Sequence, residues 1–180
     1  MTAPALLDRA RAVLLVVDIQ EGFRKAVDRF DEVAHNAAVL VQGARRLGVP
    51  VLVSEQYPRG LGDTAGELAE HLGDARRVEK VVFSAAQADG FDLDGRDQVL
   101  VCGIEAHVCV SQTVLDLLAR GVQVQVVADA VSSRTPENRR VGLDRVDRAG
   151  ALLTSTETAL FELLGRAGTD EFKAIQRLVL

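Results

Sequence analysis

Continuously apolar runs of strand length alternate with periodic, helix-like segments along almost the whole chain. The run at 12–17 (AVLLVV) contains no polar residue and ends at Asp18, as expected of a strand that is buried on both faces. From Asp31 to Leu47 apolar residues recur at spacings of three and four, which is typical of one face of a helix, and Gly48 ends the segment. The two patterns predict a strand followed by a helix, and they repeat downstream.

The same alternation continues to the C-terminus. Further strands are predicted at VPVLVS (49–54), RVEKVVFS (77–84), QVLVCG (98–103), VQVQVVAD (122–129) and ALLTS (151–155). Further helices are predicted at 64–72, 106–120, 136–150, 156–165 and 170–180, with a loop at 55–63. Pro136 suits a first helical turn, because the amide that proline lacks would be unpaired there.

This order of elements predicts an α/β fold. Right-handed strand–helix–strand crossovers would give a three-layer α/β/α sandwich around a six-stranded, mainly parallel, doubly wound sheet. We find no repeat, low-complexity tract or linker, so we expect a single domain over 1–180. Ligands of doubly wound sheets bind beyond the carboxyl ends of the strands. Residues that directly follow strands are therefore the candidates for function.

Composition and charge narrow the class of protein. Hydrophobic residues make up 48% of the chain and aromatic residues only 4%, so the core must be largely aliphatic. A net charge of −5 disfavours nucleic acids and anionic membranes as partners, and no stretch approaches the roughly 18 apolar residues that span a bilayer. The N-terminal stretch carries Asp8 and no small-residue cleavage site, so no signal peptide is expected. With two cysteines only, no disulfide framework is indicated, and we expect a cytoplasmic protein.

Three reactive side chains follow predicted strands. Asp18 follows the first, Lys80 follows or ends the short third strand, and Cys109 comes one turn after the fourth. Each alone has an ordinary structural explanation: a helix cap, a solvated lysine, a buried cysteine. Together they suggest one cleft, because the ends of parallel strands bring distant parts of the chain together.

The combination suits nucleophilic catalysis. A thiolate is the reactive form of cysteine, and a helix N-terminus and a lysine ammonium both favour it. A carboxylate can take the thiol proton and return it, and amides at the start of a helix can bind an oxyanion. Cys109 has this environment, whereas Cys102 lies inside a predicted strand and is assigned to the core.

The sequence also resembles a known family. The segments LLVVDIQEGF, EKVVFS, GIEAHVCVSQTVLDLLARG and VQVQVVADAVSSR are similar, in this order, to signature segments of the isochorismatase-like cysteine hydrolases. EQYPRGLG, the SSR segment and FKAIQ resemble the isochorismatase-domain-containing branch, and the likeness covers nearly the whole chain. The resemblance implies that Asp18, Lys80 and Cys109 form the catalytic triad.

The resemblance implies further site residues. A cis peptide bond is expected between Ile104 and Glu105, with the amides of Glu105 and Cys109 forming the oxyanion hole. The substrate-binding residues implied around the triad are Gln20, Phe23, Tyr57, Phe83 and His107. Family members commonly form dimers or rings, which implies a homo-oligomer.

The chain departs from the metal-dependent members of the superfamily. They carry D-x-H-P followed by a second histidine, whereas this chain reads Glu55-Gln56-Tyr57-Pro58 with no histidine before His71. Because a glutamate alone does not make a zinc site, we expect no metal and no other cofactor. Isochorismatases that cleave a vinyl ether generally lack the cysteine, so its presence favours acyl chemistry.

We therefore expect a hydrolase that cleaves a small amide-like C–N substrate through a covalent thioester on Cys109. Asp18 would be the general base and Lys80 the cation that holds the thiolate and orients the carboxylate. The alternative is a catalytically weak protein of the same fold whose present role is binding or scaffolding.

Overall fold

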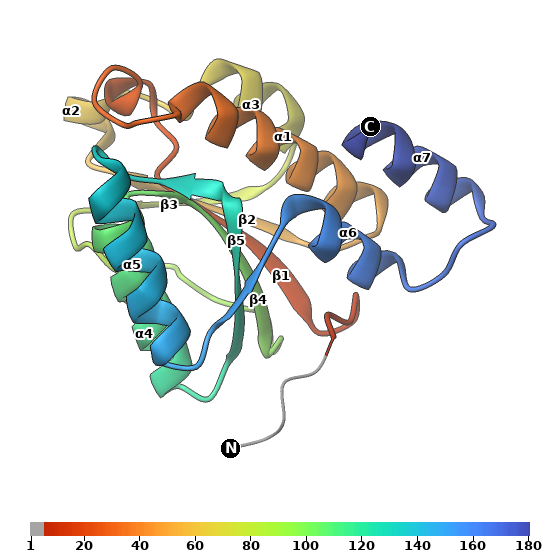
Figure 1. The fold of residues 1–180 in the computed structure, drawn as a ribbon. Coiled ribbons are helices and arrows are strands. Elements are labelled where there is room, and N and C mark those ends of the chain that lie inside the picture. The colour runs from red at the N-terminus through yellow and green to blue at the C-terminus, as the bar shows by residue number, and fades with distance from the viewer. Residues whose placement is uncertain (1–5) are drawn as a thin grey trace.

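A computed structural model describes residues 6–180 and shows one parallel sheet between two layers of helices (Figure 1). Residues 1–5, at the start of the stretch considered above as a signal peptide, lie outside the described residues. The predicted α/β/α sandwich is confirmed. Among the described residues, no helix is long and apolar enough to cross a membrane.

All six strands pair in parallel, in the order β3-β2-β1-β4-β5-β6. The sequence predicts a mainly parallel sheet, and within residues 6–180 every pairing between the named strands is parallel. The strand order reverses between β1 and β4, which is where doubly wound sheets bind ligands. The strands are β1 (Ala12–Val17), β2 (Val51–Gln56), β3 (Arg76–Lys80), β4 (Gln98–Ile104), β5 (Gln123–Ser132) and β6 (Leu152–Thr154).

Helices cover both faces of the sheet (Figure 1). One face carries α1 (Phe30–Arg46), α3 (Gly66–Leu72), α6 (Thr156–Leu164) and α7 (Asp170–Val179). The other carries α4 (Ser111–Ala119) and α5 (Pro136–Arg148). Shorter helical segments are η1 (Glu21–Phe23), α2 (Pro58–Leu61), η2 (Ala85–Gln87) and η3 (Ala106–Val110).

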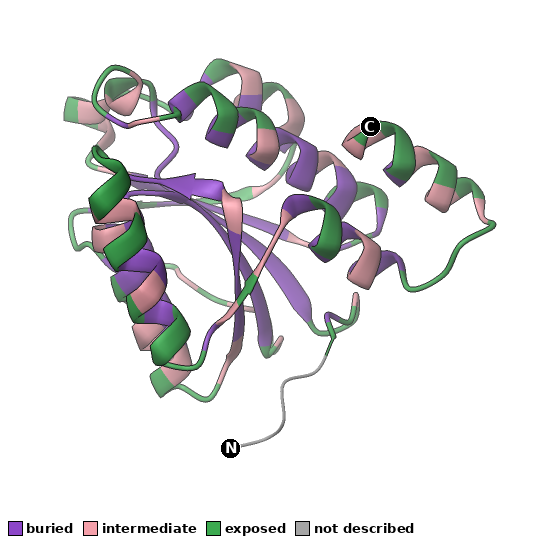
Figure 2. Cartoon of the chain, in the orientation of Figure 1, coloured by how far each residue is buried: buried purple, intermediate pink, exposed green. Residues whose placement is uncertain are grey.

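The central strands are buried on both faces, which Figure 2 shows as a purple sheet. Along β1, Leu14 and Val16 join the core under α1, whereas Val13, Leu15 and Val17 join the core under α4 and α5. Both faces of the strand therefore exclude water, which explains why its sequence is continuously apolar instead of alternating.

Two predicted elements differ from the structure near the ends of strands. The strand expected at 77–84 ends at Lys80, and residues 81–83 bend away from the sheet. The helix expected from Ala106 begins as a five-residue π-helix, η3, and becomes α-helical at Ser111. Both irregularities adjoin predicted catalytic residues, which is a common place for π-helical turns.

Candidate active site

Asp18 lies at the end of β1, inside the protein. Its backbone adopts a left-handed conformation (φ 54°), which aspartate tolerates better than most residues. The carboxylate has no solvent exposure. Its Oδ1 accepts a hydrogen bond from Ser54 Oγ at 2.7 Å, and its Oδ2 contacts Lys80 Nζ at 2.7 Å. Burial raises the pKa of Asp18, and the contact with Lys80 opposes this only in part.

Lys80 ends β3 and turns its ammonium group inward. The side chain is completely buried and forms an ion pair with Asp18. Its Nζ also donates to Gln56 Oε1 at 2.6 Å and to the Phe83 carbonyl at 3.0 Å, with the Val82 carbonyl at 3.4 Å. The bend at 81–83 brings these two carbonyls over the ammonium, which explains why the strand stops at Lys80.

Cys109 lies in η3, just after β4, and is almost completely buried. Its thiol interacts with the Asp18 carboxylate and with the Glu105 backbone amide. Burial raises the pKa of the thiol to about 12, and the negative charge of Asp18 acts in the same direction. At neutral pH Cys109 is therefore a thiol at rest, although Lys80 favours the thiolate as the sequence predicted.

Cys102 differs in its environment. It lies within β4 in the core under α1, and burial raises its pKa to about 12. Among the described titratable groups, only the charge of Asp129 adds to this shift, so no acid or base adjoins the thiol as Asp18 adjoins Cys109.

The peptide bond between Ile104 and Glu105 is cis, at the junction of β4 and η3. The Glu105 carboxylate, largely buried, accepts a hydrogen bond from Arg134 Nε at 2.9 Å. His107 Nδ1 lies 3.0 Å from Ser133 Oγ and 3.9 Å from the Glu105 carboxylate. Side chains of residues 105–107, just before Cys109, thus contact side chains of the SSR segment at 132–134.

The remaining predicted pocket residues have different surroundings. Gln20 is buried and bonds backbone atoms: its Nε2 donates to the carbonyls of Gln56 and Gly62, and its Oε1 accepts from the Gln56 amide. Phe23 packs against the core under α1. Tyr57 and Phe83 are both about half exposed.

An open pocket of about 490 Å³ lies beside Lys80. It is lined by Tyr57, α2, the end of β3 and residues 87–89. Tyr57 therefore forms part of a pocket wall, next to the site rather than inside it.

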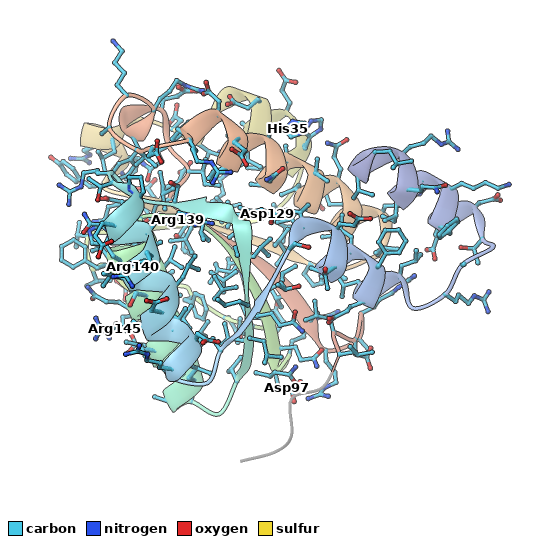
Figure 3. The ribbon with its side chains drawn as sticks, in the orientation of Figure 1. His35, Asp97, Asp129, Arg139, Arg140 and Arg145 are labelled. Atoms are coloured by element: carbon cyan, nitrogen blue, oxygen red, sulfur yellow. The ribbon has the colours of Figure 1, made fainter. Side chains whose placement is uncertain are left out.

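Glu55, the one carboxylate in the stretch compared with metal sites, has protein partners. Its Oε1 accepts hydrogen bonds from the amide and the hydroxyl of Thr64, at 3.0 and 2.6 Å. His35 lies exposed on α1 (Figure 3), far along the sequence from Cys109. Within residues 6–180, no three histidine, cysteine or acidic side chains cluster closely enough to hold a metal ion.

Three contributors to the site went unrecognised in the sequence: Ser54, Gln56 and Arg134. Ser54 and Gln56 follow the strand-end rule that identified Asp18, since both lie at the carboxyl end of β2. Arg134 belongs to the SSR segment, but its ion pair with Glu105 spans 29 residues and leaves no local pattern.

Comparisons with known proteins identify the family of the chain. The model of the isochorismatase domain matches residues 12–158. The chain belongs to the isochorismatase domain family. The family resemblance of the sequence is therefore confirmed, and the protein has an isochorismatase-family hydrolase fold.

Individual relatives and solved structures are similar to this chain. The secreted isochorismatase effector Isc1 of Phytophthora sojae is 43% identical, over 93% of this chain and 84% of its own length. The MAR1 ribonuclease structure of Caenorhabditis elegans is 38% identical with a TM-score of 0.92, covering 97% of this chain and 92% of that one. The structure of YcaC from Pseudomonas aeruginosa, solved with hexane-2,5-diol and covalent acrylamide, is 26% identical with a TM-score of 0.85. The match covers 100% of this chain and 94% of that one.

Proposed function

We propose that the protein is a cysteine hydrolase that cleaves a small amide-like substrate through a thioester on Cys109. The observation that carries the proposal is the buried Asp18–Lys80 ion pair in contact with the Cys109 thiol. A buried ion pair is costly to maintain in a core, and functional sites are where such pairs with shifted pKa values gather. The covalent acrylamide on YcaC supports a reactive nucleophile in that relative, because thiols add to the C=C bond of acrylamide and leave its amide intact.

The first half of the reaction forms the acyl-enzyme. The Cys109 sulfur attacks the substrate carbonyl carbon while its proton passes to the Asp18 carboxylate. The raised pKa of Asp18 makes it a stronger base than an exposed aspartate. As the proton moves, negative charge shifts from Asp18 to sulfur and then to the carbonyl oxygen, with Lys80 staying protonated. The amides of Glu105 and Cys109 would bind that oxygen.

The second half releases the products. The C–N bond breaks as Asp18 returns its proton to the leaving nitrogen, which leaves a thioester and a free amine. Asp18, again a carboxylate, removes a proton from water as the water oxygen attacks the thioester. The C–S bond then breaks, the acid departs, and the thiol is restored with the proton from Asp18. In sum, one water is consumed for each C–N bond.

The test is a screen of amides and carbamates with mass spectrometry of the protein. We expect a substrate that leaves an acyl adduct on Cys109 and whose hydrolysis is lost in Cys109→Ala. Cys102→Ala is the matched control and should keep activity, because Cys102 lies in the core. Full activity of Cys109→Ala would refute covalent catalysis. If no compound gave turnover or an adduct, the binding or scaffolding alternative would be favoured.

RNA is a second candidate substrate, because the C. elegans relative is named a ribonuclease. The pocket beside Lys80 favours it less: Arg59 is accompanied there by Glu79 and Asp89, which would repel phosphates. Single-stranded RNA belongs in the same screen. Cleavage that disappears in Cys109→Ala would favour RNA over small amides.

We also propose that the protein forms a homo-oligomer. YcaC of Escherichia coli is an octameric hydrolase, and this chain exposes Val81, Phe83 and Tyr57 near the site. Exposed apolar side chains that lie close together often mark a protein interface. Light scattering at micromolar concentration is the test, and a monomeric mass would contradict the proposal.

A further inference from the structure

The buried ammonium group of Lys80 has more acceptors than it has protons. Four oxygen atoms lie within 3.4 Å of Nζ, and three of them belong to neutral groups: the Gln56 side chain and the carbonyls of Val82 and Phe83. Asp18 is the one described carboxylate at ion-pair distance. The cation is therefore solvated by dipoles and paired with a single negative charge.

Gln56 is held so that its side-chain oxygen must face Lys80. Its Nε2 donates to the Val81 carbonyl at 3.2 Å, which assigns Oε1 to the ammonium at 2.6 Å. Its backbone is clamped by the side chain of Gln20, which accepts from the amide at 2.7 Å and donates to the carbonyl at 3.0 Å. Both ends of the residue are thus fixed, and the oxygen is the shortest contact of Nζ.

We propose that Gln56 is a positioning residue that holds the Lys80 ammonium against Asp18 while adding no charge of its own. The proposal rests on the proposed function, in which negative charge leaves Asp18 and arrives on sulfur. During that transfer Lys80 must stay protonated and in place, and an amide oxygen orients an N–H without competing for its charge. A carboxylate at the position of the Gln56 amide would neutralise the positive charge of Lys80 at all times and so make the Cys109 thiolate less favourable.

The other charged groups on the elements packed around the site either bind a partner of their own or lie away from the Cys109 thiol. Glu55 accepts from Thr64, and Glu105 pairs with Arg134. Glu79 lines the outer pocket, one residue before Lys80 on β3. His107 contacts Ser133. The groups that face the thiol directly are Asp18 and Lys80.

The experiment measures alkylation of Cys109 by iodoacetamide from pH 6 to 10, with peptide mass spectrometry to separate Cys109 from Cys102. The reaction joins sulfur to the reagent's methylene carbon and releases iodide and the thiol proton, so its rate follows the thiolate fraction. The variants are Gln56→Glu, which keeps the shape and adds a charge, and Gln56→Met, which removes the acceptor. Gln176→Glu, exposed on α7, is the control for net charge.

In Gln56→Glu we expect alkylation of Cys109 to be slowed about tenfold at each pH, which corresponds to a rise of about one unit in the thiol pKa. Gln56→Met should slow it less, and Gln176→Glu should match the wild type. Cys102 should stay unlabelled in every variant, which shows that each is folded. If Gln56→Glu and Gln56→Met gave the same profile, or if neither differed from the wild type, Gln56 would have a structural role only and the proposal would be wrong.

The readout needs no substrate, so the two proposals can fail separately. An alkaline shift in Gln56→Glu together with no turnover on any amide would overturn the hydrolase and leave the positioning role intact. If amides were hydrolysed on Cys109 but the pH profile of alkylation in Gln56→Glu matched the wild type, the positioning role of Gln56 would be overturned and the hydrolase would stand.

Discussion

Gly142 on α5 packs directly against the backbone of Ala106, the first residue of η3. A Cβ at Gly142 would lie 2.6 Å from both the carbonyl carbon and the carbonyl oxygen of Ala106, closer than real contacts allow. Gly142→Ala should therefore displace η3, and with it Cys109, relative to Asp18. We expect a loss of about 1–3 kcal/mol in the free energy of unfolding and a larger fall in activity than that loss explains.

Urea unfolding and turnover measure the two effects of Gly142→Ala. Gly66→Ala is the matched control, because a Cβ at Gly66 meets no atom within 4 Å and the residue begins helix α3. The control should be neutral or slightly stabilising. Equal behaviour of the two variants would show that α5 does not set the position of η3.

The ion pair between Asp18 and Lys80 should be strongly coupled in stability. Replacing either residue alone, as Asp18→Asn or Lys80→Met, leaves a polar or charged group buried without its partner and should cost about 3 kcal/mol or more. The double variant should cost less than the sum of the two by about 2 kcal/mol. Urea unfolding of the four proteins gives this coupling energy, and additive losses would contradict it. All three variants should be inactive.

The Cys109 thiol should show no plateau of reactivity near neutral pH. Because burial raises its pKa to about 12, the rate of alkylation should still be rising at pH 10. A plateau reached below pH 8 would show that Lys80 outweighs burial and the charge of Asp18.

Hydrolysis should have a different pH dependence, with an acid limb set by Asp18. The base must be ionised, and burial raises the pKa of this carboxyl above 3.8, so activity should disappear as the pH falls through that raised value. The pH profile of kcat/KM on the substrate checks this. An acid limb at or below pH 3.8 would show that Asp18 is not the base.

Thr113 should anchor the turn that carries Cys109. Its hydroxyl donates to the Cys109 carbonyl at 2.7 Å and accepts from the Ala85 amide at 2.8 Å, so one side chain connects η2 with η3. Thr113→Val keeps the shape but removes the hydroxyl that binds the Ala85 amide and the Cys109 carbonyl, which should cost about 1–3 kcal/mol. Thr113→Ser keeps the hydroxyl and should cost less. Thermal unfolding distinguishes the two, and equal losses would assign the effect to packing.

The sequence predicts most of the framework, because burial leaves a strong pattern. The wholly apolar run of β1 marks a strand covered on both sides, and the period of α1 marks its buried face. Strand ends also identify Asp18, Lys80 and Cys109 as neighbours, and the structure brings the three together.

The finer parts of the site leave no such pattern. Gln56 meets Lys80 because Gln56 and Lys80 are paired in the register between β2 and β3, and register is a property of the folded sheet. Likewise β3 ends early because the carbonyls of Val82 and Phe83 turn toward the Lys80 ammonium. Their side chains are nevertheless of types that favour strands, so the sequence predicts a longer strand. These features depend on contacts between residues rather than on the residues themselves.

The protonated, buried state of Cys109 also bears on how the protein withstands oxidants. Peroxide oxidises thiolates far faster than thiols, and it must reach the sulfur to do so. A thiol whose pKa is raised to about 12 does not meet the first condition while the site is idle. In the proposed mechanism, a substrate draws the proton to Asp18 only once its carbonyl lies beside the sulfur. While the site is empty, the thiol of Cys109 is thus kept in the form that oxidants attack least.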